Sequence, residues 1–356
     1  MPANVTPAYK AAEAAFRKAR DPEDRLECLR DMYRTIPKHK GTEHIRADIK
    51  TRMKELTEDL AGPHKGGARS GPPTVIRPDG AGQVALLGPP NSGKSALHAR
   101  LTGSHSASEP YPFATQFPQP GMMPVNDIYL QLVDLPSISP EHPIPWIANA
   151  LQPADCAMLV ADLAHPGTID RITALHENLA ERRIHLIAAW PGEGDPTSSI
   201  SDRDLFGVYL PTILVVNKID LEGDYREDVE VFEELTGYDY PYIGVSATTG
   251  AGLDDLGRWL VGHLEVVRVY TKIPGQPADL TRPFTVRRGE TVHDVARLVH
   301  KDVAHGLKFA RVWGAASFDG QQVGPDHRVV DGDVLELHSG HARFTVSRLP
   351  HHVRLH

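Results

Sequence analysis

Cysteine is scarce in this chain, and long apolar runs are absent. The two cysteines among 356 residues, Cys28 and Cys156, form no CxxC pair, which excludes a disulfide framework and a cysteine-based zinc site. The 19 histidines likewise lack companion ligands at zinc spacing. No apolar run approaches the length of a membrane span, and no signal-peptide pattern is present. We therefore expect a soluble, cytoplasmic protein with reduced cysteines.

A glycine-rich segment is the most informative feature that the sequence does contain. Residues 88–95 read Gly-Pro-Pro-Asn-Ser-Gly-Lys-Ser, after an apolar run at 84–87 and before a helical stretch at 95–101. A buried strand that leads into such a turn directs backbone N–H groups and a helix N-terminus at phosphates. Lys94 adds positive charge, and Ser95 offers a hydroxyl to Mg²⁺. The segment predicts a nucleoside triphosphate site; the alternative is a chance glycine-rich turn.

A second motif indicates which nucleotide is bound. Residues 217–220 read Asn-Lys-Ile-Asp and directly follow the β-branched apolar run 212–216, which is typical of a parallel strand buried on both faces. The carboxylate of Asp220 can accept from both guanine donors, the N1–H and the exocyclic amine, a pattern that adenine lacks. We therefore predict guanine nucleotides over adenine nucleotides.

Two further segments complete the order of a nucleotide site. Asp134 ends an apolar run and is suited to hold Mg²⁺ through water. Val-Ser-Ala-Thr at 245–248 fits a loop whose backbone N–H, at Ala247, contacts the guanine O6. The Mg²⁺ ligands predicted from these segments are Ser95 and Asp134, and Lys94 is a predicted catalytic residue. The predicted nucleotide-binding residues are Gly88, Asn91, Ser92, Gly93, Lys94, Ser95, Ala96, Asn217, Lys218, Asp220, Ser246 and Ala247.

These segments resemble a known family. Tyr-Pro-Phe-Ala-Thr at 111–115 and Asp-Leu-Pro at 134–136 are similar to the switch segments of Obg-type GTPases. Residues 266–340 resemble a TGS module, and residues 37–44 resemble the N-terminal segment of the developmentally regulated GTP-binding (DRG) branch. The resemblance implies that Thr115 senses Mg²⁺ and the γ-phosphate, which makes Thr115 the third predicted Mg²⁺ ligand and a predicted catalytic residue. It also implies that Asn91 is a candidate ligand of a stimulating K⁺ ion and so a predicted catalytic residue; the alternative is that Asn91 only caps the loop.

Two positions depart from that family. Ser137 stands where its members carry the glycine of Asp-Leu-Pro-Gly, and Ile138 stands where Ras-like enzymes carry a water-orienting glutamine. We therefore expect slow intrinsic turnover of GTP. The alternative is a hydrolysis-poor protein that binds nucleotide and acts as an RNA or ribosome scaffold. The DRG branch also carries an insertion between its third and fourth motifs, for which only the residues from Trp190 to Leu210 are available, and these are expected to form a loop.

The elements predict an α/β fold: a P-loop GTPase core with a mostly parallel sheet and helices on both faces, an N-terminal helical segment and a C-terminal β-grasp. In the N-terminal segment, Asp21 is expected to cap a helix. A helix is also expected at 291–303, and Trp313 is expected in the core. The predicted divisions are an N-terminal helical region at 1–61, a flexible linker at 62–80, a GTPase domain at 81–265, a TGS domain at 266–340 and an unassigned tail at 341–356.

Charge is uneven along the chain. The formal net charge is +4 over residues 1–70, −16 over 71–265 and +4 over 266–356. Basic ends on an acidic core predict that the terminal segments contact any anionic partner.

Taken together, the motifs predict a GTP- and GDP-binding, Mg²⁺-dependent GTPase switch. The resemblance implies contact with the ribosome or ribosomal RNA through the N-terminal helices and the TGS domain; a solvated basic helix is the alternative.

Overall fold

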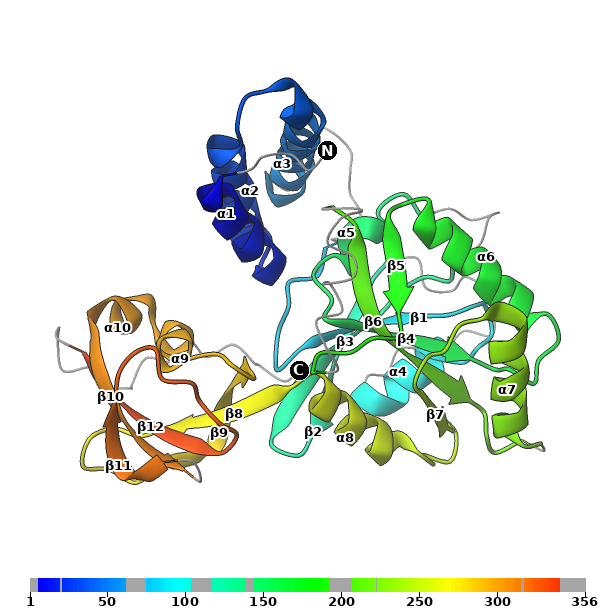
Figure 1. Cartoon of the computed structure of the whole chain (residues 1–356). Coiled ribbons are helices and arrows are strands. Elements are labelled where there is room, and N and C mark those ends of the chain that lie inside the picture. Colours follow the sequence, from blue (N-terminus) through cyan, green and yellow to red (C-terminus); the bar gives the residue numbers. More distant parts are fainter. Residues whose placement is uncertain are drawn as a thin grey trace. The chain divides into compact units, whose positions relative to one another are not determined.

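The computed structural model describes residues 6–19, 21–61, 75–103, 117–138, 144–192, 206–221, 223–314 and 317–339 (Figure 1). The chain forms two compact units. The first contains residues 1–123, 131–189 and 197–253, and the second contains 124–130, 190–196 and 254–356. The predicted linker at 62–80 lies outside the described residues up to residue 74, and the predicted tail lies wholly outside them.

Three helices form the N-terminal part of the first unit: α1 (Pro7–Lys18), α2 (Pro22–Thr35) and α3 (Glu43–Ala61), with a short 3₁₀ turn, η1 (Lys40–Thr42), before α3. The Asp21 side chain accepts from the N–H of Glu23 at 2.8 Å, which confirms its predicted capping role. Apolar side chains at helical spacing pack between the helices. The buried members of this cluster are Tyr9, Phe16, Leu29, Met32, Ile36, Ile49 and Phe206.

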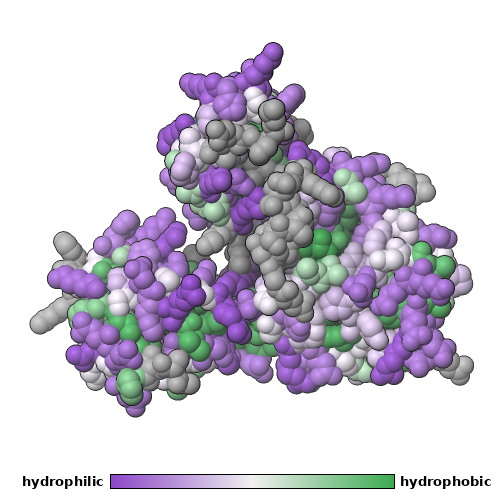
Figure 2. All heavy atoms as spheres, viewed as in Figure 1, coloured by the Kyte–Doolittle hydropathy of each residue, from purple (hydrophilic) through white to green (hydrophobic). Residues whose placement is uncertain are grey.

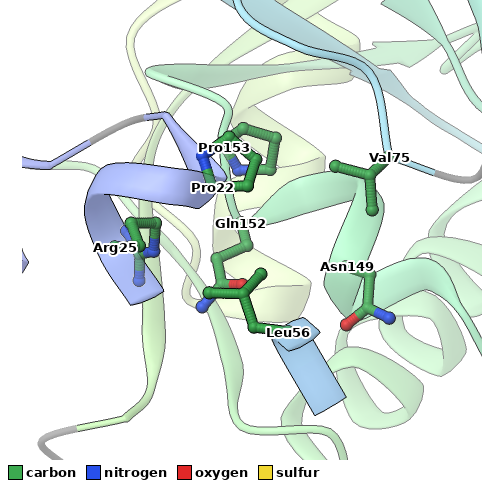
Figure 3. Close-up of a pocket in the computed structure, with 7 residues that line it drawn as sticks. All are labelled: Pro22, Arg25, Leu56, Val75, Asn149, Gln152 and Pro153. Atoms are coloured by element: carbon green, nitrogen blue, oxygen red, sulfur yellow. The ribbon is translucent and has the colours of Figure 1, made fainter. Parts of the chain in front are cut away.

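Phe206 ties this helical cluster to the nucleotide-binding part of the same unit. It comes from the segment before β6 (Val208–Asn217), is 5% exposed and meets Phe16 edge to face at 6.3 Å. The Arg52 guanidinium donates to its carbonyl at 3.3 Å. Figure 3 shows a small pocket between the N-terminal helices and the nucleotide-binding part of the unit. Pro22, Arg25 and Leu56 of α2 and α3 line it on one side, and the other lining residues are Val75, Asn149, Gln152 and Pro153. None of these residues belongs to a nucleotide motif.

A seven-stranded sheet lies largely in the first unit; only its residues 124–130 belong to the second unit. Its strands are β1 (Gln83–Leu87), β2 (Gln119–Val125), β3 (Ile128–Asp134), β4 (Cys156–Ala161), β5 (Ile184–Ile187), β6 and β7 (Tyr242–Val245). The order is β2-β3-β1-β4-β6-β5, with β7 also paired to β6. All pairs among β1 and β3–β7 are parallel. Every residue of β1 and β4 is buried, as expected of parallel strands with both faces covered.

The helices between these strands are α4 (Lys94–Thr102), α5 (Ile147–Leu151), α6 (Thr168–Ala180) and α7 (Tyr225–Thr236). Helix α8 (Leu253–His263) follows β7, and its residues after Leu253 belong to the second unit. Because β1, β3, β4, β6 and β7 run in the same direction, the loops after them meet at one edge of the sheet. This edge is where the glycine-rich segment, Asp134 and the Asn-Lys-Ile-Asp segment all lie. The predicted α/β fold is therefore confirmed.

The second unit contains a five-stranded sheet of order β11-β10-β12-β8-β9. Its elements are β8 (Val266–Thr271), β9 (Asp279–Arg287), α9 (Val292–Val299), α10 (Lys301–Gly306), β10 (Leu307–Gly314), β11 (Ser317–Val323) and β12 (Asp333–Ser339). The helix predicted at 291–303 is wrong in detail. His300 adopts an extended conformation, and its side chain caps α10 by accepting from the N–H of Asp302 at 3.1 Å.

The expectation that Trp313 lies in the core is also wrong. The core on the helical side of the sheet contains Val312 and Leu335 but not Trp313. Trp313 is only partly buried, and the Lys272 ammonium lies 4.1 Å from its ring centroid. The alternation of side chains along β10 places residues 312 and 313 on opposite faces of the sheet, which explains the difference.

A charged network joins three segments of the second unit. Arg268 on β8 donates to Asp127, in the turn between β2 and β3, at 2.9 Å and to Asp331 at 2.7 Å. The Tyr270 hydroxyl donates to the other oxygen of Asp127 at 2.6 Å. These hydrogen bonds hold the carboxyl pKa of both aspartates below its usual range. Asp127 is therefore held as an anion by two side chains of a single strand.

Figure 2 shows that hydrophilic residues cover most of the visible face, with hydrophobic residues in small separate groups. Within the described residues, no helix has the length and apolar character needed to cross a membrane.

We predict that Phe206→Ala loosens the N-terminal helices. Removing a buried aromatic ring leaves a cavity that costs about 3 kcal/mol. Hydrogen exchange of residues 7–61 should therefore quicken while GTP affinity stays unchanged. Phe318→Ala is the matched control, since Phe318 is 85% exposed and its loss leaves no cavity. Equal protection of the helices in both variants would contradict the anchoring role of Phe206.

We predict that His176 makes the first unit less stable in mild acid. His176 stacks on Tyr238 at 4.0 Å, and burial lowers the pKa of its imidazole from 6.5 to about 4. Between pH 6.5 and about pH 4, His176 is therefore protonated in the unfolded chain but neutral in the folded chain. The free energy of unfolding should fall by about 2 kcal/mol from pH 7 to pH 5.

His176→Phe keeps a ring in the stack and removes the proton site. The shift in urea midpoint between pH 7 and pH 5 should therefore shrink in this variant and persist in His44→Phe, which alters an exposed histidine. The same pH dependence in all three proteins would rule out this role for His176.

Candidate functional site

The phosphate loop is the glycine-rich segment at residues 88–95. It packs against neighbouring strands so closely that only glycine fits at two of its positions. A Cβ on Gly88 would lie 2.2 Å from the carbonyl oxygen of Val160, at the end of β4. A Cβ on Gly93 would lie 2.3 Å from the amide nitrogen of Asn217, and Gly93 has a left-handed φ of 84°. Helix α4 begins directly after this turn, so its N-terminal N–H groups face the loop. Ala96 lies in the first turn of that helix.

Lys94, Ser95 and Asp134 meet at the start of α4. The Lys94 ammonium donates to one oxygen of the Asp134 carboxylate at 2.6 Å, and the Ser95 hydroxyl donates to the other at 2.6 Å. Lys94 and Asp134 are both almost fully buried, so their charges are compensated by each other. The structure thus brings together two of the three predicted Mg²⁺ ligands and the predicted phosphate-binding lysine.

This arrangement fits Mg²⁺. The ion prefers hard oxygen ligands and takes most of them from phosphates and water, so one hydroxyl and one carboxylate are a suitable protein contribution. Among the described residues, no group of three or more His, Cys, Asp or Glu side chains could hold a metal ion. Thr115, the third predicted ligand, lies outside the described residues.

The predicted guanine-recognition segment, residues 217–220, makes direct hydrogen bonds to the phosphate loop. The Asn217 side chain donates to the carbonyl of Ser92 at 3.0 Å and accepts from the N–H of Ala247 at 3.2 Å. The Lys218 ammonium donates to the carbonyl of Asn91 at 3.1 Å. Asn217 therefore joins the phosphate loop to the loop after β7, as the predicted nucleotide site requires.

The loop after β7 is held by its own hydrogen bonds. The Ser246 hydroxyl is buried and accepts from the N–H of Thr249 at 3.0 Å, and the Ser246 N–H donates to Ala251 at 3.0 Å. Asp220 is exposed at the end of the Asn-Lys-Ile-Asp segment. Its carboxylate is therefore accessible to a base.

The two positions that depart from the Obg pattern lie just after Asp134. Ser137 is partly buried, whereas Ile138 is 3% exposed and belongs to the hydrophobic core of the sheet. Ile138 therefore packs with core residues and has no polar atom that could orient water.

Sequence reasoning missed Asp162. It directly follows β4 and accepts from the Lys218 ammonium at 2.7 Å, and it is 8% exposed. The available signal was its position after an apolar run, the same placement that identified Asp134. Without the strand order, nothing in the sequence showed that the ends of β4 and β6 are neighbours.

The chain is similar to several known proteins. Residues 83–190 match a family described as 50S ribosome-binding GTPase, and residues 267–339 match the TGS domain. An uncharacterised GTP-binding protein of Methanocaldococcus jannaschii is 27% identical over 88% of this chain and 92% of its own length. Developmentally-regulated G-protein 3 of Arabidopsis thaliana is 25% identical over 88% of this chain and 97% of its own. A crystal structure of a GTP binding protein from Pyrococcus horikoshii, 16% identical, has a TM-score of 0.46 and covers 72% of this chain and 99% of that one.

The phosphate loop, the guanine-recognition segment and the family match define a P-loop GTPase. Its C-terminal TGS domain and its similarity to relatives named as developmentally regulated G-proteins match a DRG-like GTPase.

We predict that Asp220→Asn relaxes the preference for guanine. The carboxylate accepts two guanine N–H groups, whereas an amide can accept one and donate one, which suits the C2 carbonyl of xanthine. GTP affinity should fall about 100-fold, and XTP affinity should rise. Competition binding of GTP and XTP measures the ratio. Asp239→Asn, which alters another exposed carboxylate, should leave it unchanged, and an unaltered ratio in Asp220→Asn would refute the assignment.

Proposed function

We propose that this GTPase is a Mg²⁺-dependent, K⁺-stimulated switch that acts on the ribosome or its RNA in translation or ribosome assembly. The observation that carries the switch is the meeting of Lys94, Ser95 and Asp134 at the end of β3. GTP would engage the same three side chains, so nucleotide binding exchanges their mutual hydrogen bonds for contacts to phosphate and metal. The segment after Asp134 would respond to that exchange.

Mg²⁺ would be held by Ser95 and Asp134, with Thr115 as the third expected ligand, and would neutralise charge on the β- and γ-phosphates. Lys94 adds a second positive charge at the phosphates. The left-handed Asn91, with a φ of 64°, presents its side chain from the middle of the phosphate loop and is the proposed K⁺ ligand. Such a cation would supply a positive charge, which the apolar side chain of Ile138 cannot.

Two features support a ribosomal partner. The family that matches residues 83–190 is described as 50S ribosome-binding, and both terminal segments carry a net charge of +4 while the core carries −16. The positive charge of the terminal segments would attract RNA to residues 1–70 and 266–356, which contain α1–α3 and the TGS domain, and the core would repel it. On the TGS domain, Lys308 and Arg311 are exposed on β10 and are candidates for phosphate contacts.

The test is GTP turnover by the Mg²⁺-loaded protein in K⁺ and in Na⁺ at equal ionic strength, with and without ribosomes. We expect faster turnover in K⁺, a further rise with ribosomes, and loss of the K⁺ effect in Asn91→Ser. Equal rates in K⁺ and Na⁺ would refute the K⁺ site, and no response to ribosomes would refute that partner. Tight GTP binding with negligible turnover under every condition would favour a hydrolysis-poor scaffold.

A further inference from the structure

The Lys218 ammonium contacts two groups that come from different parts of the chain. Its ammonium lies 2.7 Å from the Asp162 carboxylate, after β4, and 3.1 Å from the carbonyl of Asn91, in the phosphate loop. The Asp162 side chain is 11% exposed and that of Lys218 is 35% exposed. The pair is therefore partly shielded from water, which strengthens it relative to a surface ion pair.

Both backbone segments that this contact joins are strained. Asn91 has a φ of 64° and Lys218 a φ of 69°, in the left-handed region that non-glycine residues seldom adopt. Such conformations persist where surrounding contacts over-determine them. The Lys218 ammonium is one such contact, since it connects the guanine-recognition segment with the phosphate loop.

We propose that Asp162 is a positioning residue for GTP and GDP binding, which holds the Lys218 ammonium on the Asn91 carbonyl and so keeps the phosphate loop in its binding conformation. Asp162 touches neither phosphate nor base in this role; it acts through Lys218. The inference depends on guanine-nucleotide binding alone, and it is independent of the ribosomal partner and of K⁺.

The sign of the effect separates this role from simple electrostatics. Asp162 is an anion near a site for a polyanion, so Coulomb's law alone predicts that Asp162→Asn tightens nucleotide binding, and tightens GTP more than GDP. A positioning role predicts the opposite: roughly tenfold weaker binding of both GTP and GDP, because either ligand needs the same loop conformation. The preference for GTP over XTP should not change, since Asp220 is untouched.

The experiment measures GTP and GDP affinities, by calorimetry in Mg²⁺ buffer, for the full-length protein and for Asp162→Asn, Lys218→Met and the double variant. If Asp162 acts through Lys218, Asp162→Asn weakens binding about tenfold in the parent but has little further effect in the Lys218→Met background. Asp170→Asn, which removes an exposed carboxylate from α6, is the charge control and should bind like the parent.

Unchanged or tighter binding by Asp162→Asn would overturn the proposal. Additive losses in the double variant would also overturn it, because Asp162 would then act independently of Lys218. A thermal unfolding scan without nucleotide identifies a variant that simply fails to fold; in that case Asp162→Glu, which keeps the charge, must restore affinity toward the parent value, and its failure to do so counts against the proposal. Loss of nucleotide binding by the parent protein itself would instead refute the GTPase assignment.

Discussion

The close approach of the phosphate loop to the ends of β4 and β6 is the constraint on which the site depends. Gly88 leaves room for the Val160 carbonyl, and Gly93 leaves room for the Asn217 side chain, each at a distance that no Cβ could tolerate. Because Asn217 then reaches the Ser92 carbonyl and the Ala247 N–H, three loops from different strands become one structure. The predicted phosphate and guanine subsites therefore share one set of connected loops, so a movement of one subsite displaces the other.

The strands of that scaffold and most of the site could be predicted from the sequence, because each motif follows an apolar run and the ends of parallel strands meet at one edge. Asp162 could not be found in this way. An aspartate after an apolar run is common, and its role appears only when β4 is placed between β1 and β6. The same limit applies to Phe206, whose burial among the N-terminal helices depends on contacts far away in the sequence.

The TGS domain shows a second reason for the limits of prediction. Residues 317–323 read Ser-Phe-Asp-Gly-Gln-Gln-Val, a composition poor in strand-forming residues, yet they form β11 through pairing with β10. Tertiary pairing here overrides local preference. At His300 the opposite occurs, since the apolar pattern continues through 291–303 while one residue in an extended conformation divides the helix. A periodic pattern records which face is buried and does not record a break in the backbone.

The position of Ile138 determines how hydrolysis must work in this protein. Its side chain lies in the core with Leu135 and Ile144, and so cannot be turned toward the phosphates without leaving a cavity in that core. The attacking water therefore needs a polar group or charge from elsewhere, for example from the phosphate loop or from a partner. A group on the phosphate loop is already held in place by the contacts of Lys218 and Asn217, whereas a partner's group is present only in the complex. Dependence on the partner would make turnover a signal of correct engagement, which is the behaviour expected of a switch.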